Sequence, residues 1–232
     1  MNEHPYMFGR NGAVSSVETR NRVLRNTYWL LALSMIPTVL GAWVGLATGF
    51  SLFAATSPAM SMLAFFAIAF GFMFAIQRTK DSAAGVFVLL GFTFFMGLML
   101  SRILAFVLGF SNGPSLIMLA FGGTGVIFAA MATIATVSKR DFSGLGKWLF
   151  MGVIVILLAS VANVFLQLPA LMLTVSVMAI VIFSAYIMFD VQRVVNGGET
   201  NYITATLAIY LDLYNVFVNL LALLGIFGGN RN

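Results

Sequence analysis

The stretch from Tyr186 to Gly225, YIMFDVQRVVNGGETNYITATLAIYLDLYNVFVNLLALLG, decides the fold. It contains two carboxylates, Asp190 and Asp212, in sequence that is otherwise apolar enough to lie in lipid. An acidic residue at the centre of a membrane helix costs about 2.5–3.5 kcal/mol on insertion scales. Such residues usually face the interior of a helix bundle or a water-filled path. We therefore interpret the rest of the chain as helices that surround these two acids.

The composition is that of an integral membrane protein. Of 232 residues, 61% are hydrophobic and 8% are charged, whereas a soluble domain carries about 25% charged residues. The absence of cysteine excludes disulfides, thiol nucleophiles and thiolate metal sites, and the single His4 excludes a histidine-based metal site or triad within the chain. The net charge of +5 does not indicate nucleic acid, because the basic residues flank apolar runs and are explained by topology.

Long apolar windows predict seven helices of about 20 residues or more. These runs are continuous rather than alternating, which argues against a β-barrel. The predicted fold class is therefore an all-α integral membrane protein, a seven-transmembrane-helix bundle. We expect a polar cytoplasmic tail at 1–26 that ends at most in a short interfacial helix, and a short C-terminal tail at 228–232. The expected spans are about 27–49, 57–77, 82–110, 114–137, 147–167, 169–193 and 202–227.

The distribution of positive charge predicts the orientation. Ten of the 12 Lys and Arg residues lie in the N-terminal tail and in the second–third, fourth–fifth and sixth–seventh connections. Only Arg102 and Arg231 fall on the other side. Because cytoplasmic connections carry an excess of Lys and Arg, we expect a cytoplasmic N-terminus and a C-terminus on the far side.

Small residues cluster in the fourth span. This cluster is compatible with a hinge or a pore lining, but we favour close packing of the helix through its small face. Its members are Gly122, Gly123, Gly125, Ala129, Ala130 and Ala132.

The seventh span carries a polar stripe. Asp212, Asn215 and Asn219 have the i, i+3, i+7 spacing that places residues on one helical face. For the two asparagines we favour a structural role, namely hydrogen bonds to neighbouring helices. For Asp212 we favour a functional role, because an ionised carboxylate in the membrane needs a partner or water.

Asp190 lies near the end of the sixth span, where Arg193 at i+3 could form an ordinary salt bridge with it. The sixth and seventh helices are antiparallel and joined by a short loop at 196–200, so we expect both acids in the cytoplasmic half. A modest offset would bring Asp190 and Asp212 into contact. Two carboxylates in one site cannot both ionise at low cost, so we expect the pair to share one proton near neutral pH. Loss of that proton would leave an anionic pair that repels itself or attracts a cation.

The C-terminal motifs resemble those of the Bax-inhibitor family, the transmembrane Bax-inhibitor-motif proteins. The resemblance extends over 27–227 and is closest to the bacterial inner-membrane branch that includes a modulator of the FtsH protease. The segments that carry it are Val23–Tyr28, Phe165–Ala170, Phe189–Gln192, Gly197–Ile203 and Leu211–Leu221.

The resemblance implies a pH-sensitive calcium leak in which Asp190 and Asp212 form a hydrogen-bonded, proton-sensing pair. It also implies that an arginine near the end of the second helix latches this pair, and Arg78 is the nearest match, although a plain flanking charge is the simpler interpretation of the sequence. Ca²⁺ prefers oxygen ligands, so the two acids are candidate cation ligands. No acid lies inside the second span, so an additional ligand there, and tight calcium binding, are not expected.

Two functions remain open at this stage. The first is a pH-sensitive calcium or cation leak channel in the bacterial inner membrane, with no tightly bound cofactor. The alternative is a regulatory protein whose N-terminal tail binds an ATP-dependent, FtsH-like membrane protease. An enzyme is not expected: the lysines near the spans lie at helix ends, which disfavours a retinal pump, and the histidines of a metalloprotease are lacking. A di-aspartyl protease is the weakest alternative.

Overall fold

The computed structural model describes residues 8–50 and 57–230. Within these residues it is all-helical, with seven helices that are each long and apolar enough to cross a membrane. This confirms the predicted fold class. The helices are α1 (Phe8–Thr48), α2 (Pro58–Thr79), α3 (Ala83–Leu108), α4 (Gly113–Val137), α5 (Leu145–Leu166), α6 (Pro169–Val195) and α7 (Tyr202–Gly228).

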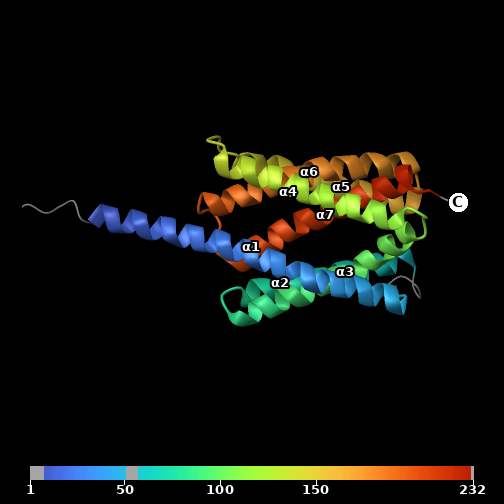
Figure 1. Cartoon of the computed structure of the whole chain (residues 1–232), viewed down its shortest axis with the longest axis horizontal. Helices are drawn as coiled ribbons and strands as arrows, with labels where there is room; N and C mark the ends of the chain where they lie inside the picture. The colour runs from blue at the N-terminus through green and yellow to red at the C-terminus, as the bar shows by residue number, and fades with distance from the viewer. Residues whose placement is uncertain (1–7, 51–56, 231–232) are drawn as a thin grey trace, which may run out of the picture.

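The two ends of the bundle carry different connections. Figure 1 shows the start of α1 and the α2–α3, α4–α5 and α6–α7 loops at one end, and the C-terminus with the α3–α4 and α5–α6 turns at the other. The first set contains the Lys- and Arg-rich segments, so we call that end the basic end. The start of α1 and the end of α7 therefore lie at opposite ends of the bundle.

The beginning of the chain differs from the expected tail. Helix α1 begins at Phe8 and continues without a break into the first span, so it extends beyond the other helices (Figure 1). Glu18 and Arg22 are four residues apart, a spacing that supports a helix. Val23 is buried in a cluster with Val194 of α6 and Ala205 of α7. A helix therefore covers most of the segment that was expected to be a tail, and Val23 near its end contributes an apolar contact to the bundle.

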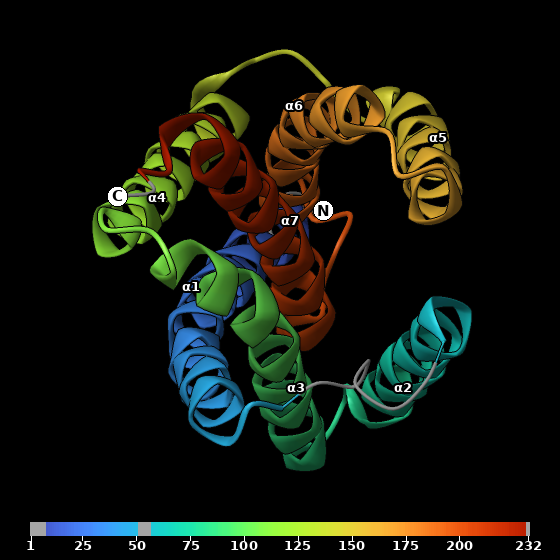
Figure 2. The same ribbon diagram turned by 90° about the vertical axis from the view of Figure 1, so that its right-hand side faces the viewer.

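Helix α7 occupies the centre of the bundle. Figure 2 shows it surrounded by α1, α3, α4 and α6, while α2 and α5 lie at the periphery. Its fully buried side chains include Ile203, Ile209 and Val216. A shift of α7 would therefore alter its packing against four neighbouring helices, α1, α3, α4 and α6.

The closest helix pair is α1 with α3, and glycines make it possible. A Cβ at Gly41 would collide with the carbonyl oxygen of Phe94, and a Cβ at Gly97 would collide with the carbonyl oxygen of Thr38. These contacts are reciprocal, so each backbone lies against the other. Close approach through small residues is a common way for membrane helices to pack.

The small residues of α4 do not make such a contact. Gly122 and Gly125 have no neighbouring atom within 4 Å of an added Cβ, and Gly123 meets only a side-chain atom of Leu220. Gly122 and Gly125 therefore do not provide the close packing expected of them, whereas Gly123 makes an ordinary contact with α7 and Ala132 packs against the core. Composition alone does not show which small-residue face meets a neighbour, and here that face belongs to α1 and α3.

Candidate functional site

The structure brings Asp190 of α6 and Asp212 of α7 together. Their side chains are close enough to share a hydrogen bond. Both are buried, with exposed fractions of 9% and 5% respectively. Two carboxyl groups have only acceptor atoms when ionised, so a hydrogen bond between them requires a proton on one of them. The structure thus places the two carboxyl groups in a close, buried contact between α6 and α7.

The two acids have unequal surroundings. Asp190 Oδ1 lies 3.6 Å from Nη1 of Arg193. Asp212 Oδ2 is buried and accepts no hydrogen bond from any residue that the structure describes. A buried ionised carboxylate without a donor or counter-charge is strongly unfavourable. Asp212 is thus the member of the pair that is least able to carry a negative charge in this conformation.

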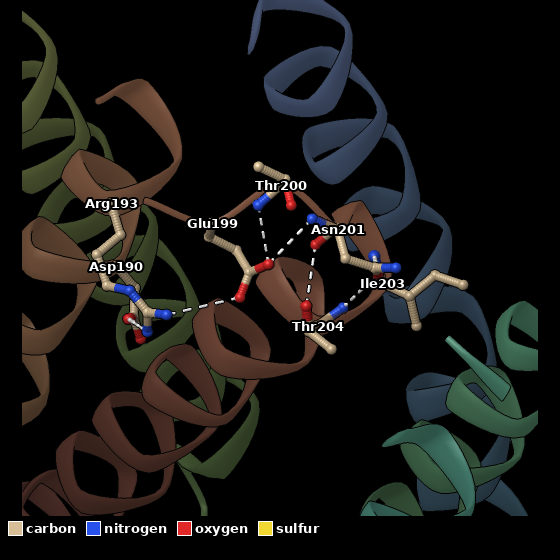
Figure 3. Close-up of polar contacts among 7 residues, drawn as sticks. All are labelled: Asp190, Arg193, Glu199, Thr200, Asn201, Ile203 and Thr204. Atoms are coloured by element: carbon tan, nitrogen blue, oxygen red, sulfur yellow. Dashed lines mark hydrogen bonds and ion pairs between the residues drawn. The ribbon is translucent and has the colours of Figure 1, made fainter. Parts of the chain in front are cut away.

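Arg193 is shared between two carboxylates (Figure 3). Its second guanidinium nitrogen, Nη2, lies 3.6 Å from Oε2 of Glu199 in the α6–α7 loop. Oε1 of Glu199 accepts hydrogen bonds from the backbone N–H groups of Thr200 and Asn201, each at 2.9 Å. Glu199 is therefore fixed by the backbone, and Arg193 connects this fixed acid to the pair.

The sequence analysis missed Asn201. Its Oδ1 accepts from the backbone N–H groups of Ile203 and Thr204, at 2.9 and 3.2 Å, and so caps the start of α7. Its Nδ2 donates to the carbonyl oxygen of Lys80 and to Oδ1 of Asp81, both at 2.9 Å. An asparagine just before an apolar helix is a recognisable N-cap signal, but its contact with the α2–α3 loop has no signal in a single sequence.

Gln192 makes a second connection between loops. Its Oε1 accepts from the backbone N–H of Phe142 at 2.7 Å, and its Nε2 donates to the carbonyl oxygen of Arg140 at 2.8 Å. The α4–α5 loop is thereby held to α6 two residues after Asp190. Asn201 and Gln192 thus tie the α2–α3 and α4–α5 loops to the ends of α7 and α6 that lie near the pair.

The asparagines of the α7 stripe bond within their own helix. Nδ2 of Asn215 donates to the carbonyl oxygen of Leu211, and Nδ2 of Asn219 donates to that of Asn215, both at 2.8 Å. Neither amide nitrogen follows the expectation of bonding to a neighbouring helix. A stripe predicts a shared face but not the partner of each group.

Two tyrosines of α7 do make hydrogen bonds to neighbouring helices. The hydroxyls of Tyr210 on α7 and Thr38 on α1 are 2.9 Å apart, and the hydroxyl of Tyr214 donates to the carbonyl oxygen of Met96 on α3 at 3.2 Å. Tyr210 and Tyr214 flank Asp212 in sequence. They fix the register of α7 against α1 and α3 around the pair.

Arg78 is not brought to the pair. It is exposed at the end of α2, with its guanidinium carbon 5.1 Å from the centre of the Phe74 ring. Among residues 18–50 and 57–230, no ion pair joins it to Asp190 or Asp212. The arginine that contacts the pair in this conformation is Arg193.

The pair also lacks the ligands of a strong metal site. In the part of the chain that the structure describes, no three His, Cys, Asp or Glu side chains are grouped to hold a metal ion. Ca²⁺ takes about six to eight oxygen ligands. Asp190 and Asp212 could therefore contact a passing cation, but they do not form a cage for a resident one.

Comparison with known proteins identifies the family. The family model described as "Inhibitor of apoptosis-promoting Bax1" matches residues 20–229. The chain belongs to the Bax-inhibitor family. Among similar Bax-inhibitor proteins, the "Modulator of FtsH protease YccA" of Escherichia coli K12 is 37% identical over 91% of this chain and 93% of its own length. An "Uncharacterized membrane protein" of Vibrio cholerae is 35% identical over 97% of this chain and 98% of its own length.

These relatives also bear on location. The same relative in another Escherichia coli strain is named "Inner membrane protein YccA", and the chain has seven helices of membrane-spanning type within its described residues. The prediction of a multi-pass protein of the bacterial inner membrane is confirmed.

Proposed function

We propose that this Bax-inhibitor-family protein is a pH-sensitive cation leak, with calcium as the favoured ion, gated by Asp190 and Asp212. The observation that carries the proposal is the buried contact of two carboxyl groups across the α6–α7 interface. On this proposal, the conformation described above corresponds to the protonated, closed form. On this proposal the protein has no catalytic activity and needs no tightly bound cofactor.

The gating step follows from the charges. With one shared proton, the pair is a hydrogen bond between α6 and α7. Without it, two buried anions repel each other at close range, and Oδ2 of Asp212 accepts no hydrogen bond from the described residues. The free energy falls if α7 shifts away from α6 or if a cation and water enter between them. Because α7 is central, such a shift opens the middle of the bundle to ions.

Calcium flux into proteoliposomes of the purified protein tests this proposal. We expect flux to rise as the pH is raised through neutrality, and we expect Asp190→Asn and Asp212→Asn each to abolish this dependence on pH. Both variants keep the side-chain shape and remove one titrating group. A flux-versus-pH curve that both variants leave in place would make the pair structural and would reject the proposed gate.

Modulation of an FtsH-like membrane protease is the second candidate. It is favoured by the name of the Escherichia coli relative, which aligns over nearly its whole length. The extension of α1 beyond the bundle (Figure 1) offers a partner a helical handle. On this proposal the bundle binds the protease and limits its access to substrates.

The two candidates separate experimentally. Removal of residues 1–17 leaves Val23 and its buried cluster in place. If the protein is a protease modulator, this truncation should relieve its effect on FtsH-dependent degradation of a membrane substrate and leave calcium flux unchanged. If the pair-gated leak is the main function, Asp212→Asn should change flux and leave degradation unchanged. A truncation without effect on degradation would count against the tail as the binding handle.

A further inference from the structure

We infer that Arg193 and Glu199 together set the pH at which the aspartate pair loses its proton. Arg193 favours the ionised pair, and Glu199 opposes it by holding part of the Arg193 charge. The inference deepens the proposed proton switch and rests on it, because it names two residues outside the pair that tune its response.

Asp190 and Glu199 compete for the guanidinium group of Arg193. Its two terminal nitrogens lie at equal distances, 3.6 Å, from an oxygen of Asp190 and an oxygen of Glu199. Its side chain is 45% exposed, with the guanidinium carbon 6.0 Å from the centre of the Phe189 ring, so it is less constrained than a buried side chain. Glu199 is not free in this way, since two backbone N–H groups hold its other oxygen. The movable partner is therefore Arg193, and the fixed competitor is Glu199.

Other charged groups around the pair do not share this position. On α7, the titratable group at this position is Asp212 itself. On α6, the titratable side chain of Tyr186 is close enough to interact with both acids. In the α4–α5 loop, Arg140 offers its carbonyl oxygen to Gln192, and hydrogen bonds from Ser143 lower the pKa of Asp141. Within residues 18–50 and 57–230, no ion pair reaches Asp190 from α1, α2, α3, α4 or α5.

The signs of the two effects are opposite. An adjacent cation stabilises a carboxylate, so removal of the Arg193 charge should make the pair hold its proton to higher pH. An adjacent anion has the reverse effect, and Glu199 also withdraws Arg193 from Asp190. Removal of the Glu199 charge should therefore make the pair release its proton at lower pH. General loosening of the fold would move both variants in the same direction.

Infrared titration of the purified protein tests the inference. The protonated-carboxyl band of the pair is assigned by its loss in Asp212→Asn, and its midpoint is followed against pH. We expect Arg193→Gln to raise the midpoint by about 0.5–1 pH unit and Glu199→Gln to lower it by about 0.5 unit, after allowance for solvent screening. Arg193→Lys, which keeps the charge, should stay near the wild type.

Two matched variants serve as controls. Arg140→Gln and Asp141→Asn make the same charge changes in the α4–α5 loop and should leave the midpoint unchanged. In the double variant Arg193→Gln/Glu199→Gln, the effect of Glu199→Gln should shrink, because its main route through Arg193 is gone. Shifts in one common direction, shifts no larger than those of the controls, or a wild type without a titrating band would overturn the inference.

The readout also separates this inference from the proposed leak. If the midpoints move in opposite directions while wild-type liposomes show no flux that depends on pH, the tuning stands and the leak fails. If flux depends on pH and on the pair while the midpoints do not move, the leak stands and Arg193 and Glu199 are structural.

Discussion

Asn201 and Lys80, which are 121 positions apart, are joined by a hydrogen bond of 2.9 Å from Nδ2 of Asn201 to the carbonyl oxygen of Lys80. The same side chain caps α7 through its Oδ1. One residue therefore links the helix that carries Asp212 to the loop between α2 and α3. The basic end of the bundle is held together by this contact and by Gln192 on the other side of the pair.

Replacement of Asn201 by alanine should destabilise the protein. The change removes the cap of α7 and the link to the α2–α3 loop, and the loss of a cap alone costs about 0.5–2 kcal/mol. We expect a lower apparent melting temperature in detergent. Thr200→Ala is the control, because Thr200 is exposed and takes part in this network only through its backbone N–H. Equal melting temperatures for the two variants would show that the Asn201 cap does not contribute to stability.

Gly41→Ala should weaken the contact between α1 and α3. The added Cβ would overlap the carbonyl oxygen of Phe94, a backbone atom that cannot turn aside, and overpacking of this kind typically costs about 1–3 kcal/mol. Gly122→Ala adds the same methyl group to α4 where nothing lies within 4 Å, and it should be neutral or slightly stabilising because alanine favours a helix. Comparison of the melting temperatures of the two variants tests this difference. Equal losses in both variants would contradict the packing described here.

The sequence predicted the helices well because charged residues are too costly to place at random in a membrane segment. Asp190 and Asp212 could be paired in advance because a short loop forces α6 and α7 to be antiparallel neighbours. The extension of α1 back to Phe8 was not predicted, because the polar residues before Asn26 lack the apolar run that located the first span.

The details of the site depend on rotamers and on loop positions. From the sequence, Glu199 is a lone acid in a polar loop. Nothing there indicates that the backbone N–H groups of Thr200 and Asn201 hold its side chain beside Arg193. Asn215 and Asn219 show the same limit, since their spacing fixes the face they share but not whether they bond to a neighbour or to their own helix.

The resemblance and the contacts point to different arginines, and flux measurements can choose between them. Arg78 is exposed over Phe74, whereas Arg193 contacts Asp190. We expect Arg193→Gln to shift the flux-versus-pH curve more than Arg78→Gln does. A larger shift in Arg78→Gln would mean that Arg78 reaches the pair in another conformation and acts as the latch that the resemblance implies.

The orientation of the bundle in the membrane is a further prediction. The Lys- and Arg-rich loops and the start of α1 share one end, and the C-terminus lies at the other (Figure 1). By the positive-inside rule the basic end is cytoplasmic. A reporter that is active only outside the cytoplasm should therefore be active when fused after Asn232 and inactive when fused before Met1. The reverse pattern would overturn the proposed topology and place the pair near the far side.

The central claim is that the proton shared by Asp190 and Asp212 holds α6 against α7. Hydrogen–deuterium exchange across residues 186–214, corrected for the intrinsic effect of pH, tests it most directly. The account predicts that amide protection at the facing ends of α6 and α7 falls as the pH is raised through neutrality in the wild type. In Asp212→Asn, whose amide can still donate to Asp190, protection should not change with pH. Protection that is constant in the wild type, or that falls equally in Asp212→Asn, would contradict the claim.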